Sequence, residues 1–102
     1  KGKVSLDFTR LEKIMKIADF PIVIHGCSDL PEEDLKKIIS FNPSKMNIST
    51  EIKHVYLNTY KDYLCNDNNN YEPINAIKLV YENTKKLVAD YMDKFGSSNR
   101  YN

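Results

Sequence analysis

The sequence lacks the features that would place it in a membrane or on a nucleic acid. No apolar run approaches the ~20 residues that a membrane-spanning helix needs. The 15 basic and 14 acidic residues leave a net charge of only +1, so no bulk field attracts an anionic partner. The N-terminal residues also lack the apolar stretch of a secretory signal. We therefore expect neither a membrane nor a nucleic acid as a partner.

Cysteine is scarce as well. Cys27 and Cys65 stand far apart and form no CxxC pair, so neither a disulfide framework nor a cysteine-based zinc motif is indicated. Reduced thiols in a cytoplasmic protein are the expected state. The 102 residues make at most one small domain, and the chain does not begin with Met. We interpret it as a segment of a larger protein.

Apolar residues at helical spacing and two short β-branched runs predict an alternation of helices and strands. The expected order starts with a helix over about residues 8–18 capped by Asp7, a strand over 21–24 buried on both faces, and a helix capped by Ser28 or Asp29 and ended by Asn42. The buried face of that second helix is expected to comprise Leu35, Ile38 and Ile39. A strand over 45–48 follows, then a helix capped by Ser49 or Thr50 with Glu51 near its positive end, a polar loop over 66–70, and a last helix opened by Pro73 and terminated by Gly96. This order indicates βα units and a parallel sheet. Because two parallel strands cannot form a covered sheet alone, further strands should belong to a larger parent.

The inner faces of the last two helices are predicted from their apolar spacing. The first stripe comprises Ile52, Val55, Tyr56, Thr59, Tyr63 and Leu64, and the second Ile74, Ile77, Val80, Tyr81, Thr84, Leu87, Val88, Tyr91, Met92 and Phe95.

Polar residues follow each predicted strand, where the reactive groups of parallel sheets and barrels lie. His25, Gly26 and Ser28 follow the first strand, and Asn47, Ser49 and Thr50 lie at the end of the second. Two helix N-termini side by side would form a phosphate site. On spacing alone, a hydrogen-bonded rim histidine, a turn glycine and helix-capping hydroxyls are the favoured alternatives. Because the two motifs occur together, one βα unit apart, a ligand-binding site is favoured over these alternatives.

The two motifs resemble the C-terminal part of class II, zinc-dependent fructose-bisphosphate and tagatose-bisphosphate aldolases. The family has an apolar strand ending in His-Gly-small-Ser-Gly, an apolar residue, Pro and an acidic helix start, which here reads "IVIHGCSDLPEEDLKKII". A Lys-apolar-Asn-apolar-Asp-Thr-acidic strand end follows, here "KMNISTEI". A Phe-Gly-Ser tail is typical, and here begins at Phe95. The resemblance covers nearly the whole chain and implies the last two strands of a (β/α)8 barrel, with residues 1–102 as one C-terminal segment.

The resemblance also implies residue roles. His25 matches one of three histidines that bind the catalytic zinc, which acts as a Lewis acid on the ketose carbonyl. Gly26 and Ser28 match the loop that binds the phosphate of dihydroxyacetone phosphate, and the Gly26 carbonyl matches a ligand of a monovalent cation, Na⁺ or K⁺. Asn47 matches the asparagine that contacts the reacting end of the substrate. Thr50 matches a second phosphate contact.

The implied activity is cleavage of fructose or tagatose 1,6-bisphosphate to dihydroxyacetone phosphate and glyceraldehyde 3-phosphate, by a full-length enzyme expected to form homo-oligomers. Ser49 stands where the family has an aspartate and keeps its hydrogen-bonding capacity as a substrate contact. Asp29 replaces a common glycine. These two departures favour the alternative hypothesis of a truncated or non-catalytic module that binds phosphate or a protein partner.

A third hypothesis is a small helical interaction domain, which parallel pairing of residues 21–24 with 45–48 would exclude. The second histidine, His54, is interpreted as a surface residue of the third helix.

Overall fold

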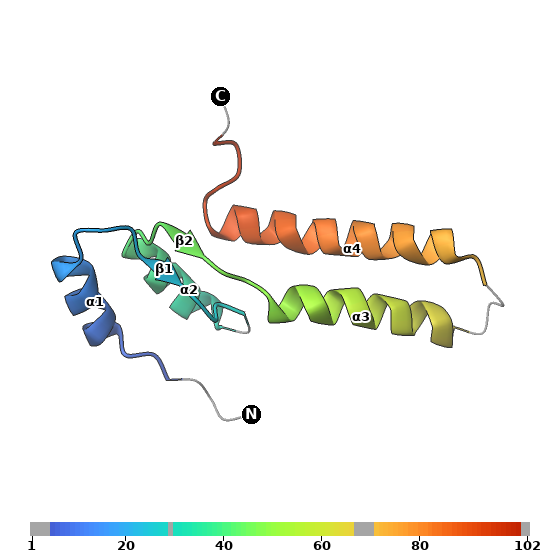
Figure 1. Cartoon of the computed structure of the whole chain (residues 1–102), viewed down its shortest axis with the longest axis horizontal. Coiled ribbons are helices and arrows are strands. Elements are labelled where there is room, and N and C mark those ends of the chain that lie inside the picture. The colour runs from blue at the N-terminus through green and yellow to red at the C-terminus, as the bar shows by residue number, and fades with distance from the viewer. Residues whose placement is uncertain (1–4, 29, 67–70, 101–102) are drawn as a thin grey trace. The chain divides into compact units, whose positions relative to one another are not determined.

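The computed structural model describes residues 5–28, 30–66 and 71–100. Within them the order of helices and strands is the predicted one (Figure 1). The elements are α1 (Phe8–Ile17), β1 (Val23–Ile24), α2 (Glu32–Ser40), β2 (Lys45–Met46), α3 (Thr50–Cys65) and α4 (Pro73–Lys94). The polar loop predicted over residues 66–70 falls largely outside the described residues. The chain divides into two compact units, Lys1–Ile48 and Ser49–Asn102.

The two strands of the first unit pair in parallel, as predicted. Val23 lies opposite Lys45, and Ile24 lies opposite Met46. Two further main-chain bonds extend the pairing, from Ser44 N to Ile22 O and from Asn47 N to Ile24 O, each 2.9 Å long. This β1–α2–β2 arrangement excludes a purely helical interaction domain. Helices with a parallel pair are compatible with a portion of a larger α/β fold.

The prediction that the first strand is buried on both faces is wrong for this chain. The Val23 side chain is 41% exposed, whereas Ile24 is half-buried. Both strands are also shorter than predicted, with two residues each. The cause is physical: within the described residues the sheet has two strands, so each has an open edge and few neighbours to cover its faces.

The predicted cap of α1 is confirmed, whereas the predicted cap of α2 is not. Asp7 Oδ1 accepts a hydrogen bond of 2.9 Å from Arg10 N at the start of α1. In α2 the N-cap position belongs to Pro31 and not to Ser28. The other predicted cap, Asp29, lies outside the described residues. Glu32 and the two acidic residues after it favour this helix start, because they lie at the positive end of the helix dipole.

The buried side chains of the first unit are few and come from the β1–α2 region. Leu35 and Ile38 of α2 are 4% and 3% exposed, as their helical spacing predicts. Cys27, just after β1, is fully buried. The helix ends at Ser40, and Asn42 adopts a left-handed conformation with φ 56°, as is common just after a helix.

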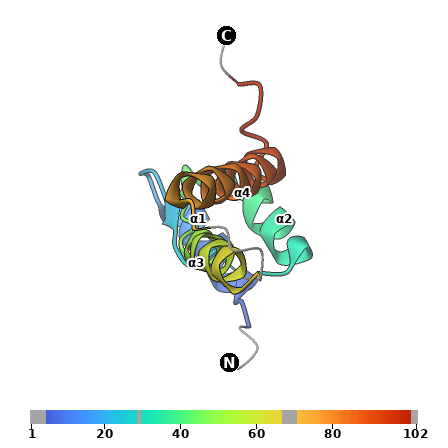
Figure 2. The ribbon, with the colours of Figure 1, turned by 90° about the vertical axis from the view of Figure 1, so that its right-hand side faces the viewer.

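The second unit is a helical hairpin. The chain direction shows α3 and α4 running antiparallel, and the two helices lie side by side in both views (Figures 1 and 2). The Tyr63 hydroxyl donates a 2.8 Å hydrogen bond to the carbonyl of Glu72 and ties the end of α3 to the start of α4. Gly96, at φ 63°, follows the last helix as its predicted terminating glycine. Among the described residues, no helix is long and apolar enough to cross a bilayer.

The predicted inner stripes of these two helices are only partly buried. Thr59, Val80 and Tyr91 are buried as predicted, and Ala76 joins them. Several stripe residues are instead exposed by 41–72%: Tyr56, Leu64, Ile74, Ile77, Tyr81, Val88 and Met92. The spacing correctly marks an apolar surface, but within this unit α3 and α4 cover only a narrow strip of each other.

Candidate active site

The parallel pairing brings His25 and Asn47 together at the carboxyl ends of β1 and β2. The Nδ2 atom of Asn47 lies 3.1 Å from Nδ1 of His25, although the two residues are 22 positions apart in sequence. His25 is exposed and Asn47 is half-buried. Both residues belong to the first unit of the chain.

The main chain fixes both residues of this pair. Asn47 N donates to Ile24 O at 2.9 Å, and Cys27 N donates to Asn47 O at 3.4 Å. The residue before His25 and the second residue after it are therefore both bonded to Asn47. Because these bonds involve backbone atoms alone, the position of the two side chains is a consequence of the strand register.

Gly26 has a conformational reason to be glycine. Its φ of 74° lies in the left-handed region, which a residue with a side chain adopts at a cost. A Cβ at this position would meet no described atom within 4 Å. The glycine therefore serves the turn after β1, and the space beside it is open to a ligand.

Cys27 is buried, unlike the exposed histidine two residues before it. Its side chain is fully buried, and Sγ lies 3.7 Å from the carbonyl oxygen of Ile24, to which the thiol donates. Burial raises the pKa of the Cys27 thiol, and a hydrogen bond with the backbone of Asn47 lowers it by a smaller amount. Cys27 is a packing residue of the first unit.

Ser28, Ser49 and Thr50 are the remaining predicted substrate contacts. Ser28 is half-buried in the turn before α2. Ser49 holds the N-cap position of α3, as predicted, although its side chain makes no capping hydrogen bond among the described residues, and Thr50 is the first residue of that helix. Both begin the second unit, so a shared phosphate site with Ser28 stays a prediction.

Glu51 is predicted from the sequence only as a favourable charge at the start of α3. Its Oε2 atom is buried without a hydrogen-bond partner among the described residues. The signal that could have drawn attention to it is its place directly after the Ser-Thr pair at the end of the second motif.

The described residues contain no group of three or more His, Cys, Asp and Glu side chains that could hold a metal ion. Zinc sites in enzymes need three protein ligands, so this part of the chain supplies His25 as a single candidate ligand. His54 lies exposed on α3, as predicted.

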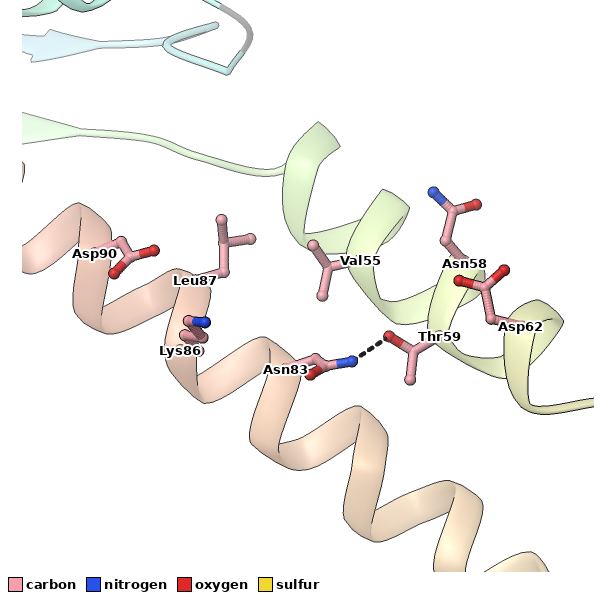
Figure 3. A pocket seen from close by; sticks show the side chains of 8 residues that line it. All are labelled: Val55, Asn58, Thr59, Asp62, Asn83, Lys86, Leu87 and Asp90. Carbon is pink, nitrogen blue, oxygen red and sulfur yellow. Dashed lines mark hydrogen bonds between the residues drawn. The ribbon is translucent and has the colours of Figure 1, made fainter.

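A groove of about 340 Å³ lies along the seam between α3 and α4 (Figure 3). The Asn83 side chain donates a 3.0 Å hydrogen bond to Thr59 Oγ1 within it. The lining combines apolar, amide and oppositely charged groups: Val55, Asn58, Thr59, Asp62, Asn83, Lys86, Leu87 and Asp90. The bond between Thr59 and Asn83 gives this groove a role in joining the helices.

Comparison with known proteins agrees with the motifs. The sequence profile of the family described as fructose-bisphosphate aldolase class-II matches residues 1–100. The fructose-bisphosphate aldolase of Geobacillus stearothermophilus is 33% identical over 100 residues, which cover 98% of this chain and 35% of the relative. The fructose-bisphosphate aldolases of Staphylococcus aureus strains Mu50 and MW2 match with the same identity and coverage. The chain thus spans about a third of the length of these relatives, and it belongs to the class II fructose-bisphosphate aldolase family.

Proposed function

We propose that this chain forms the last two strands of a (β/α)8 barrel and carries part of the active site of a zinc-dependent aldolase. The reaction is the reversible cleavage of fructose or tagatose 1,6-bisphosphate to dihydroxyacetone phosphate and glyceraldehyde 3-phosphate. Family membership supports the reaction class. The observation that carries the proposal is the contact between His25 and Asn47 at the ends of two parallel strands.

His25 fits the part of a zinc ligand. Its imidazole is exposed at the carboxyl end of β1, and a neutral imidazole nitrogen is a good ligand for zinc. When bound, zinc supplies Lewis-acid polarisation of the ketose carbonyl. The other two protein ligands would come from strands outside these 102 residues.

The other site residues act on the substrate. Asn47, beside the ligand histidine, contacts and orients the reacting end of the ketose. Gly26 and Ser28 bind one phosphate through the turn after β1, with the Gly26 carbonyl as a ligand for Na⁺ or K⁺. Ser49 and Thr50 bind phosphate at the start of α3, where free N–H groups favour an anion.

We further propose that the full-length enzyme is a cytoplasmic homo-oligomer. The support is the apolar surface that α4 leaves exposed, including Ile74 and Ile77, which are 58% and 56% exposed. Helix surfaces of this kind in soluble proteins pack against another protein surface. The rest of the barrel or a neighbouring subunit would provide that surface.

A hybrid enzyme tests the proposed reaction. This chain would replace the corresponding C-terminal third of the Geobacillus stearothermophilus aldolase, and the kcat/KM for fructose 1,6-bisphosphate and the zinc content would be measured. We expect His25→Ala to lower kcat/KM by about 100-fold or more, because loss of even an indirect partner of a metal site costs about 10–100-fold. His54→Ala, the exposed second histidine, is the matched control and should leave both values unchanged.

Full activity in the His25→Ala hybrid would refute the proposal. A folded hybrid that binds the bisphosphate without turnover would favour the non-catalytic module instead. The 102-residue chain alone should show no aldolase activity and only weak zinc binding, because one histidine does not make a zinc site. Tight stoichiometric zinc binding by the isolated chain would contradict this assignment.

A further inference from the structure

The contact between His25 and Asn47 also indicates which of the two side chains donates the hydrogen bond. The atom of Asn47 that faces the imidazole is the amide nitrogen Nδ2, which can only donate a hydrogen bond. Nδ1 of His25 must therefore accept, and it can do so only with a lone pair. In the neutral imidazole the proton then resides on Nε2.

We propose that the Asn47 side chain sets the tautomer of His25 and holds the lone pair of Nδ1 in reserve for a metal ion. Asn47 is in this respect a positioning residue for His25, in addition to any contact it makes with the substrate. The inference rests on the proposed function insofar as it names a metal. The tautomer itself is a property of the chain without metal.

The hydrogen bond links the state of the Asn47 amide to that of the His25 imidazole. While the amide of Asn47 donates to Nδ1, that nitrogen has no lone pair left for a cation. A metal ion held by Nδ1 would require the amide to release the nitrogen, and the N–H groups of Asn47 would then be available to an oxygen atom of the substrate. Metal binding and the release of Asn47 would thereby be coupled.

The main chain makes this pair suitable for side-chain substitution. Asn47 holds its place through its own backbone N and O, which bond to Ile24 and Cys27. Replacement of its side chain leaves these bonds intact. Asn47→Asp is a nearly isosteric change that converts a donor into a group that only accepts, so it should move the imidazole proton to Nδ1.

Nitrogen-15 NMR of the imidazole rings tests the proposal directly on the 102-residue chain at a pH where the rings are neutral. The chain has only two histidines, and His54→Ala assigns the spectrum. In the unmodified chain we expect Nε2 of His25 to carry the proton, in a tautomer ratio roughly fivefold higher than that of exposed His54, as one ordinary hydrogen bond allows. Asn47→Ala should bring the ratio to that of His54, and Asn47→Asp should reverse the preference.

Several results would overturn the proposal. One is an Nδ1-protonated His25 in the unmodified chain, as expected if the side-chain oxygen of Asn47 faced the ring. Another is a tautomer ratio that neither Asn47 variant changes, with Asn58→Ala as the exposed asparagine control. The unmodified chain decides the first point whether or not a variant folds.

Zinc chloride tests the metal part separately. Zinc chloride is added until the imidazole NMR signals of His54 change. The exposed His54 thereby shows that the zinc concentration is high enough to bind an accessible histidine. We expect zinc to change the Nδ1 signal of His25 and to release the side-chain amide of Asn47 in the same titration. A response at Nε2, or none at His25 while His54 responds, would refute Nδ1 as the metal-binding nitrogen. The tautomer result would stand independently of zinc and of the hybrid enzyme's activity.

Discussion

Each of the two units is stabilised internally by a different kind of interaction. In the first unit, main-chain hydrogen bonds between β1 and β2 fix the strand ends, and the register of the two strands brings residues 25 and 47 together. In the second unit, α3 and α4 share a seam of side chains such as Val80 and Thr59, in which Asn83 donates to the Thr59 hydroxyl. The first unit positions its polar groups by backbone, and the second depends on side-chain packing.

This difference bears on where polar residues of the proposed site can lie. A side chain on a strand end can be exposed and still be well positioned, because the backbone bonds do not involve it. His25 is exposed in just this way. A helix seam offers the opposite: Val80 and Tyr91 are 4% and 8% exposed, and their removal would loosen the contact itself. Polar residues for catalysis are therefore tolerated more easily at the strand ends.

The largest effect should follow from Leu35→Ala in the first unit. Leu35 is 4% exposed, and a buried Leu→Ala change costs about 2–5 kcal/mol of unfolding free energy. Hydrogen exchange would measure the loss unit by unit. We expect amides of the first unit to lose protection while those of α3 and α4 keep theirs. Ile17→Ala, at a position 82% exposed, is the control. Equal losses in both units would show that they unfold together.

The next effect concerns the helical seam. Val80→Ala removes two methyl groups from a residue that is 4% exposed, and should cost about 2 kcal/mol, from about 0.8 kcal/mol for each buried group and the cavity that is left. The adjacent residue is a matched control on the same helix, because Leu79 is 43% exposed and its replacement by Ala should cost far less. Urea unfolding followed by circular dichroism measures both. A larger loss for Leu79→Ala would mean that another surface packs on that face.

The sequence predicts the order of all the elements, because caps, proline positions and apolar spacing are local signals. Asp7 caps α1, Pro73 opens α4 and Gly96 follows it, all as expected. The contact of His25 with Asn47 also follows from two parallel strands, whose carboxyl ends meet at one edge.

Burial was predicted less well, because it depends on partners that a spacing pattern does not name. Val23 and Ile77 have the apolar character of buried residues, yet they are 41% and 56% exposed. The donor role of Asn47 toward Nδ1 was not predictable either, since a side-chain rotation decides it. The start of α2 at Glu32 differs from the prediction because Ser28 lies in the preceding turn.

A smaller effect should come from the polar bond in the seam. Asn83→Ala leaves the hydroxyl of Thr59, a residue only 6% exposed, without its donor, which should cost about 1–2 kcal/mol. The exposed Asn58 lines the same groove, and Asn58→Ala is the control (Figure 3). Unfolding of Asn83→Ala, Thr59→Val and the double variant gives the coupling between the two side chains. Additive losses would show that the bond contributes nothing to the stability of the hairpin.

The smallest effect compares one glycine from each unit. Gly26 and Gly96 have φ of 74° and 63°, and at both positions a Cβ would meet no described atom within 4 Å. The cost of Gly→Ala should therefore be conformational alone and nearly equal in the two units, about 1 kcal/mol in thermal unfolding.

The two glycine variants should differ in the hybrid enzyme. Gly26→Ala should raise the KM for the bisphosphate, because the added methyl group occupies the open space beside the proposed phosphate loop, whereas Gly96→Ala should leave KM unchanged. Equal stability losses with this split in KM would separate a ligand role of Gly26 from its role in the turn. If KM were equal in both variants, Gly26 would serve the turn alone, and the phosphate would have to bind through the start of α3.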